Sequence, residues 1–86
     1  MSTGYRNTRQ RVLIILEMLR DSKDGLTVKQ IRQKLYDEYN LITDRKTIYQ
    51  DLYAIEFLYP IIRKKQATTY YSIEVNNDTL RNKSNP

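Results

Sequence analysis

The chain has 86 residues, which is enough for one small domain and too few for two. Its 15 Lys and Arg residues outnumber its 10 Asp and Glu residues, and the net charge of +5 points to a polyanionic partner. The chain has no His, no Cys and only two Gly, so it lacks the commonest general base, the thiol nucleophile, the soft metal ligands and a Gly-rich phosphate loop. We therefore expect no enzyme activity, no metal and no cofactor.

The sequence also gives no sign of a membrane protein. No apolar run approaches the roughly 20 residues that span a bilayer, and the first residues lack the apolar core of a signal peptide. The lack of Cys fits a reducing compartment. We expect a cytoplasmic protein with no membrane partner.

Residues 1–7 are predicted to form a flexible arm, either a frayed end or a basic arm that touches phosphate. A first helix is predicted over residues 8–22. Its buried face has apolar residues at positions i, i+3, i+4 and i+7, namely Val12, Ile15, Leu16 and Leu19. Further apolar residues surround much of this helix, so either the C-terminal strands or a second copy of the chain must cover it. The sequence leaves both options open.

A turn that contains Gly25 leads to a second predicted helix, which continues to about Tyr39. Thr27 is the predicted N-cap, and Gln30 completes a capping box. The buried residues of this helix are predicted to be Val28, Ile31 and Leu35. Its amino end, with Thr27 and Lys29, can hold a DNA phosphate through backbone amides and a lysine.

Residues 40–43 form a short link, in which Leu41 and Ile42 are expected to fill the angle between the helices. A third helix is predicted to begin at Asp44 and to end before Pro60. Its buried stripe is predicted to consist of Ile48, Leu52 and Ile55. At about 100° per residue, the opposite column consists of Lys46, Gln50, Tyr53 and Phe57, flanked by Thr47 and Tyr49. Asp51 falls beside the buried stripe, so we expect it to pair with a basic residue or a helix end.

Strand-forming residues over 61–64 and 69–73 predict a β-hairpin with a loop of about four residues, 65–68. Basic and amide side chains are expected at its tip, namely Arg63, Lys64, Lys65 and Gln66. They are either charges that protect an edge strand or contacts to phosphate or a minor groove, and we favour the second interpretation. The fold class predicted from these elements is mainly α with a small β-hairpin, that is, a winged helix-turn-helix domain over residues 8–75. Residues 76–86 are predicted to be a disordered tail.

Residues 44–52 read D-R-K-T-I-Y-Q-D-L, which resembles the S-R-R-T-I-Y-R-D-L signature of the recognition helix in bacterial winged helix-turn-helix regulators. The nearest groups are the WYL-domain and DeoR-type families. The identical residues are Thr47, Ile48, Tyr49, Asp51 and Leu52. Lys46 is a conservative match, Asp44 stands at the family's capping Ser, and Gln50 replaces an Arg. The resemblance extends more weakly from about residue 8 to about residue 73.

The resemblance implies a sequence-specific double-stranded DNA-binding protein, most simply a transcriptional regulator. The residues expected on the recognition helix are Arg45, Lys46, Thr47, Tyr49, Gln50 and Tyr53. Those expected to hold phosphate are Thr27, Lys29, Arg63, Lys64, Lys65 and Gln66. Gln50 can bond adenine bidentately and Lys46 can reach the acceptors of guanine.

Members of these families usually carry a ligand-sensing domain after the winged helix, whereas this chain stops at Pro86. We therefore expect a stand-alone factor with no small-molecule effector, of the kind that phages and other mobile elements carry. A repressor or an activator, as a monomer or a homodimer, remains open. Two alternatives are an excisionase-like architectural DNA-binding factor and a winged-helix module that binds another protein.

Overall fold

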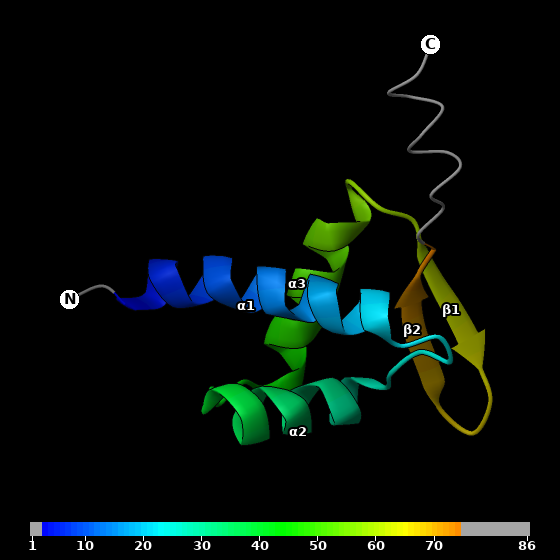
Figure 1. Ribbon diagram of the computed structural model, residues 1–86, viewed down its shortest axis with the longest axis horizontal. Coiled ribbons are helices and arrows are strands. Elements are labelled where there is room, and N and C mark those ends of the chain that lie inside the picture. The colour runs from blue at the N-terminus through cyan, green and yellow to red at the C-terminus, as the bar shows by residue number, and fades with distance from the viewer. Residues whose placement is uncertain (1–2, 75–86) are drawn as a thin grey trace, which may run out of the picture.

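The computed structural model describes residues 3–74, with side chains from residue 8 onward, and contains three helices followed by an antiparallel hairpin (Figure 1). The elements are α1 (Thr3–Asp21), α2 (Val28–Tyr39), α3 (Arg45–Glu56), β1 (Ile61–Lys65) and β2 (Thr69–Ile73). This confirms the predicted fold class, and the arrangement is that of a winged helix. The predicted disordered tail, residues 76–86, lies outside the described residues.

Helix α1 begins at Thr3, five residues before the predicted start at residue 8. Residues 3–7, which were assigned to a flexible arm, therefore continue the helix. Gly4 costs only about 1 kcal/mol in a helix, and no proline precedes Pro60 to stop the extension. None of the helices within residues 3–74 is long and apolar enough to cross a membrane.

Helix α2 has the capping box that its sequence predicts. The Thr27 hydroxyl oxygen accepts a hydrogen bond from the Gln30 amide at 3.0 Å, and the Gln30 side-chain oxygen accepts one from the Thr27 amide at 3.0 Å. The helix ends at Asn40, whose φ of 58° places it in the left-handed region that terminates helices. The boundaries of α2 are therefore set locally, by the residues at its two ends.

The link between α2 and α3 differs from its prediction at one position. Leu41 is half-buried and packs against the core, as expected, whereas Ile42 is 88% exposed and does not fill the angle between the helices. Neighbouring side chains of extended backbone point to opposite sides, so Ile42 points outward where Leu41 turns toward the core. Thr43 on the next position is buried instead.

The hairpin packs beside α1 and the start of α2. Its loop has three residues, 66–68, one fewer than predicted, because Lys65 already pairs with Thr69. Leu26 and Tyr71 exchange two backbone hydrogen bonds of 2.8 Å, so the chain before α2 lies along β2. Gly25 makes this approach possible, since its φ is +86° and an added Cβ would lie 3.1 Å from the Tyr71 carbonyl oxygen.

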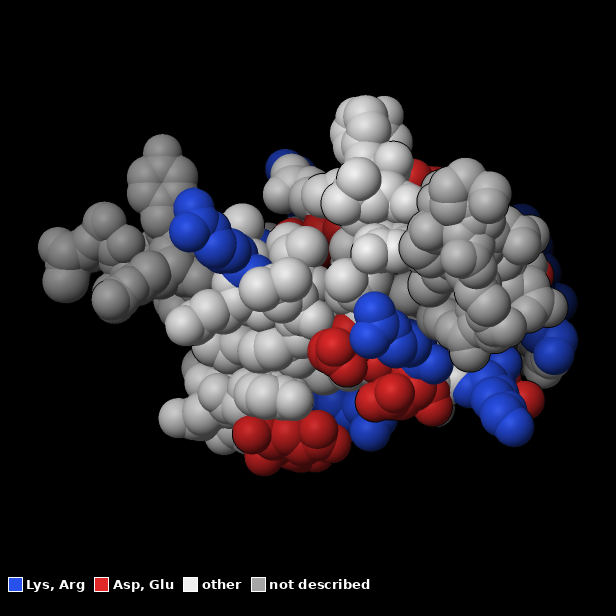
Figure 2. Space-filling view, turned by 45° about the horizontal axis from the view of Figure 1, so that its top comes forward, with Lys and Arg blue, Asp and Glu red and all other residues white. Residues whose placement is uncertain are grey.

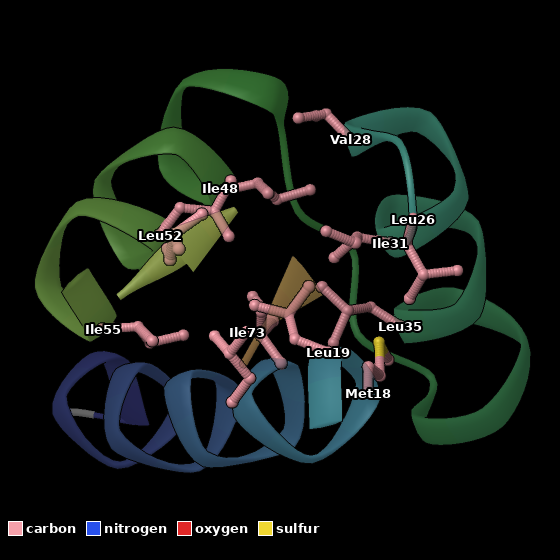
Figure 3. Close-up of a cluster of buried hydrophobic side chains, with 12 residues drawn as sticks. Met18, Leu19, Leu26, Val28, Ile31, Leu35, Ile48, Leu52, Ile55 and Ile73 are labelled. Atoms are coloured by element: carbon pink, nitrogen blue, oxygen red, sulfur yellow. The ribbon is translucent and has the colours of Figure 1, made fainter. Parts of the chain in front are cut away.

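One hydrophobic core holds these elements together, and Figure 3 shows side chains of the three helices and of Ile73 on β2 gathered in it. It contains Ile15, Met18, Leu19, Leu26, Val28, Ile31, Leu35, Ile48, Leu52, Ile55, Ile61 and Ile73. The predicted buried faces of α2 and α3 are confirmed. On α1, Ile15 and Leu19 are buried, whereas Val12 and Leu16 lie at the edge of the core and Leu13 is exposed.

Asp51 is buried on α3 and pairs with Arg11 of α1, which confirms its predicted structural role. Both guanidinium nitrogens Nε and Nη2 donate to the carboxylate, the second at 3.1 Å. These hydrogen bonds raise the pKa of Arg11 further. Because a buried carboxylate is costly without a partner, this pair fixes how α1 crosses α3 and hence which face of α3 remains outside.

Candidate nucleic-acid interface

The outward column of α3 lies on the surface, as its sequence predicts. We call Lys46, Gln50, Tyr53 and Phe57 the α3 ridge. All four side chains are exposed, with Tyr53 at 71% and Phe57 at 82%. None of the four is acidic, so the ridge offers an ammonium group, a carboxamide, a phenol and an aromatic ring to any partner.

The ridge begins at the N-cap of α3. The Asp44 carboxylate accepts a hydrogen bond of 2.8 Å from the Thr47 amide. Hydrogen bonds from the Thr47 hydroxyl and then its amide lower the pKa of Asp44. Thr47 is half-buried and takes part in this cap, and it does not belong to the outward surface. That surface is lined by Arg45, Lys46, Tyr49, Gln50 and Tyr53.

Two aromatic residues stiffen the far end of the ridge. The rings of Tyr53 and Phe57 meet edge to face, with centroids 6.1 Å apart and planes at 71°. This is a favourable geometry for an aromatic pair. The two rings are therefore held against each other while they remain open to solvent.

A cleft separates the amino ends of α2 and α3 from the hairpin. The residues that line it come from three elements and their links, namely Thr27, Val28, Lys29, Arg45, Tyr49, Thr68, Thr69 and Tyr71. Lys29, which is predicted to hold phosphate, and Arg45, which is predicted on the recognition helix, are both exposed. Thr27 differs from that prediction, because it is buried and the capping box occupies both its amide and its hydroxyl. The backbone amides of Val28 and Lys29 lie in the first turn of α2, where N–H groups have no hydrogen-bond partner within the helix.

The four predicted hairpin residues divide into two groups. Lys64, Lys65 and Gln66 are exposed, with Gln66 opening the loop. Arg63 lies in the middle of β1 and not at the tip, and its guanidinium group pairs with Glu56 at the end of α3 at 2.8 and 2.9 Å. The structure thus brings Lys65 and Gln66 to the tip and directs Arg63 toward α3.

Strand alternation explains why Arg63, unlike Lys64, is directed toward α3. Residues 61, 63 and 65 share one face of β1, and their partners on β2 are residues 73, 71 and 69. Ile61 and Ile73 are buried, so this face is turned to the helices. Arg63 lies over the Tyr71 ring, 5.8 Å from its centroid. Lys64 points to the opposite face.

Tyr71 was not expected at this site. It lines the same cleft as Tyr49, and burial, followed by the nearby Tyr49, raises its pKa against the opposing effect of Arg63. The two-residue alternation of β2 would indicate that Thr69 and Tyr71 share a face with Arg63, and the short link from α3 to β1 would indicate that Glu56 lies close to β1. Neither indication can be used without the strand register, which cannot be read from the sequence.

The acidic residues next to the α3 ridge are engaged by other groups of the protein. Asp44 caps α3 and Glu56 pairs with Arg63, so both acids beside the ridge have partners. On the face drawn in Figure 2, basic and acidic side chains lie next to one another. Among residues 3–74, no group of three His, Cys, Asp or Glu residues is placed to hold a metal ion.

Comparisons of the chain with protein-family models, with curated proteins and with solved structures find no significant match.

Proposed function

We propose that this chain is a sequence-specific double-stranded DNA-binding protein that inserts α3 into the major groove, as the resemblance to WYL-domain and DeoR-type regulators implies. The observation that carries the proposal is the α3 ridge, an exposed, acid-free helix face beside a cationic hairpin. An α-helix fits the major groove, where amide and basic side chains distinguish base pairs. A solvated helix face would ordinarily mix both signs of charge.

The residues divide by the chemistry that each can perform. Gln50 would bond adenine through its carboxamide, and Lys46 would reach the O6 and N7 acceptors of guanine. Arg45 and Lys29, which line the cleft beside the hairpin, and the exposed Lys65 of β1 would contact phosphates. Base contacts would supply specificity, and phosphate contacts would fix the register.

The biological role that we propose for this binding is transcriptional regulation. An architectural factor that bends DNA for a recombinase would use the same surface. Occupancy of promoters in cells supports the first role, and occupancy of recombination sites supports the second.

One observation favours a second candidate function, the binding of another protein. Phe57 and Leu58 are 82% and 79% exposed at the carboxyl end of α3. Exposed apolar groups of this size can mark a contact surface. Such a contact would respond little to salt, whereas each neutralised phosphate makes DNA binding steeply salt-dependent.

The test is selection of bound sites from random duplex DNA, followed by a gel shift of the selected site over a salt series. We expect an enriched motif and an affinity that falls linearly on a log–log plot with a slope of about −0.9 for each phosphate contacted. A matched comparison replaces Lys65 or Lys34 with Gln. Lys65→Gln should flatten the slope by about one unit. Lys34→Gln should leave the slope unchanged, because Lys34 lies on α2 and pairs with Glu38. Enrichment of no motif, together with a salt-independent affinity, would overturn the proposal.

A further inference from the structure

The ion pair between Arg63 and Glu56 joins the hairpin to the end of α3. Two guanidinium nitrogens donate to the two carboxylate oxygens, at 2.8 and 2.9 Å. This bidentate geometry fixes the direction of the arginine as well as its distance. The hydrogen bonds from Arg63 lower the pKa of Glu56 below its ordinary value.

The second contact of Arg63 lies on the neighbouring strand. Its guanidinium carbon is 5.8 Å from the centre of the Tyr71 ring, within the range of a cation–π interaction. Tyr71 in turn lies beside Tyr49 of α3 along the cleft. Arg63 is thus held from two sides, by a carboxylate at the end of α3 and by an aromatic ring of β2.

These contacts matter because the hairpin is anchored at its base and along β2, whereas most of β1 and the loop are exposed. Ile61 and Ile73 are buried at its base, and Leu26 pairs with Tyr71, whereas residues 62–68 are exposed. The Leu26–Tyr71 bridge ties the middle of β2 to the chain before α2, so it does not by itself fix β1 against the end of α3. Among the residues whose side chains the structure describes, Arg63–Glu56 is the only ion pair that joins the hairpin to a helix.

We propose that Arg63 is a positioning residue, which together with Glu56 forms a latch that holds the hairpin at a fixed angle to α3, and that it is not a phosphate contact. The inference rests on the proposed DNA binding for its consequence, because the latch sets the distance from the α3 ridge to Lys65 and Gln66. Fixing that distance before binding reduces the ordering cost that the complex must otherwise meet.

The opposing assignment makes Arg63 a phosphate clamp that Glu56 restrains in the free protein. The two assignments predict opposite signs. If Glu56 restrains a clamp, Glu56→Gln frees a cation and strengthens binding. If the pair is a latch, Glu56→Gln releases the hairpin and weakens binding, although the protein loses a negative charge.

The experiment measures affinity for the selected duplex over a salt series with Glu56→Gln, Arg63→Lys and the double variant. Arg63→Lys keeps the charge and removes the planar fork that makes the bidentate contact. We expect each single variant to weaken specific binding by about two- to fivefold, as for other exposed ion pairs, with an unchanged salt slope. The double variant should be no weaker than either single one, because both remove the same interaction.

Two control variants separate the latch from general effects of charge. Glu38→Gln breaks a comparable exposed pair with Lys34 on α2 and should leave the affinity unchanged. Lys64→Gln removes a predicted phosphate contact from the opposite face of β1 and should flatten the salt slope by about one unit, whereas the latch variants should leave the slope unchanged. Tighter binding by Glu56→Gln, or full retention of affinity by Arg63→Lys, would overturn the latch.

A measurement on the free protein keeps this inference separate from the proposed function. Amide hydrogen exchange in residues 62–65 and 69–72 should accelerate in Glu56→Gln and Arg63→Lys, while exchange in α2 stays as in the wild type. If the wild type binds no DNA, the proposed function fails and this measurement still decides the latch. Unchanged exchange in both variants would overturn the latch even if DNA binding is confirmed.

Discussion

Gln50 combines two properties that matter at the scale of a single residue. It is exposed in the middle of the α3 ridge, and its carboxamide carries both a donor and an acceptor. A carboxamide can therefore pair with the N6 and N7 edge of adenine in the major groove. Gln50 replaces the Arg of the resembled signature, so this chain should prefer adenine where an arginine would prefer guanine.

We predict that Gln50→Ala costs about 1–3 kcal/mol of binding free energy on the selected site and relaxes preference at one base pair. Repeating the site selection with the variant checks this directly. Gln10, an exposed glutamine on α1, provides the matched control, and Gln10→Ala should leave the selected motif unchanged. An equal loss of affinity on selected and random DNA would show that Gln50 does not read a base.

At the scale of the element, the N-cap of α3 stabilises the helix and sets where its first basic residues lie. Asp44 satisfies the Thr47 amide and so fixes the first turn, from which Arg45 and Lys46 project. The hydrogen bonds from Thr47 lower the pKa of Asp44 from its ordinary value. The folded state therefore binds fewer protons at this group than the unfolded chain does, which stabilises the fold at neutral pH.

This cap predicts an acid-sensitive contribution to stability. The contribution is complete well above the ordinary Asp pKa of about 3.9, and it disappears as the pH falls through the lowered value. Asp44→Asn keeps a good N-cap and removes the titration. The difference in thermal stability between wild type and Asp44→Asn should therefore shrink as the pH falls from 6 toward roughly 2.5. A difference that is independent of pH would contradict the role given to the Asp44 carboxylate.

The same scale shows which elements the sequence could predict. The boundaries of α2, the N-cap of α3 and the buried residues of both helices follow from local patterns, namely a capping box, an acidic cap and helical periodicity. The start of α1 at Thr3 has no such signal, because nothing between residues 3 and 8 favours a helix strongly or stops one. The exposure of Ile42 depends on the geometry of the link and could not be read from hydrophobicity.

At the scale of the whole molecule, the site depends on contacts between distant segments. The ridge could be predicted because one helix displays it, whereas the partner of Arg63 could not, because Glu56 lies on α3 and the pair forms only once the hairpin folds back. The cleft that joins Thr27, Tyr49 and Tyr71 likewise needs three elements in place. Sequence therefore predicted the candidate reading surface but not the arrangement of the hairpin beside it.

The α1–α3 crossing is the global feature that leaves the ridge outside. The Arg11–Asp51 pair and the core residues of α3 together bury one side of that helix. The opposite side, with Lys46, Gln50 and Tyr53, is exposed to solvent, and Lys65 on the hairpin is exposed as well. A duplex that occupies the ridge and the hairpin tip at once is the partner that fits both features.

The most direct measurement of this claim is a titration of the isotope-labelled chain with the selected duplex, followed by the backbone amide chemical shifts in NMR spectra. We predict the largest changes along the exposed face of α3, from Arg45 to Tyr53, and at residues 64–66, with the outer face of α1 nearly unchanged. Changes confined to α1 or to Phe57 and Leu58, with the amides of Lys46 and Gln50 unmoved, would contradict the assignment of α3 as the helix that reads DNA.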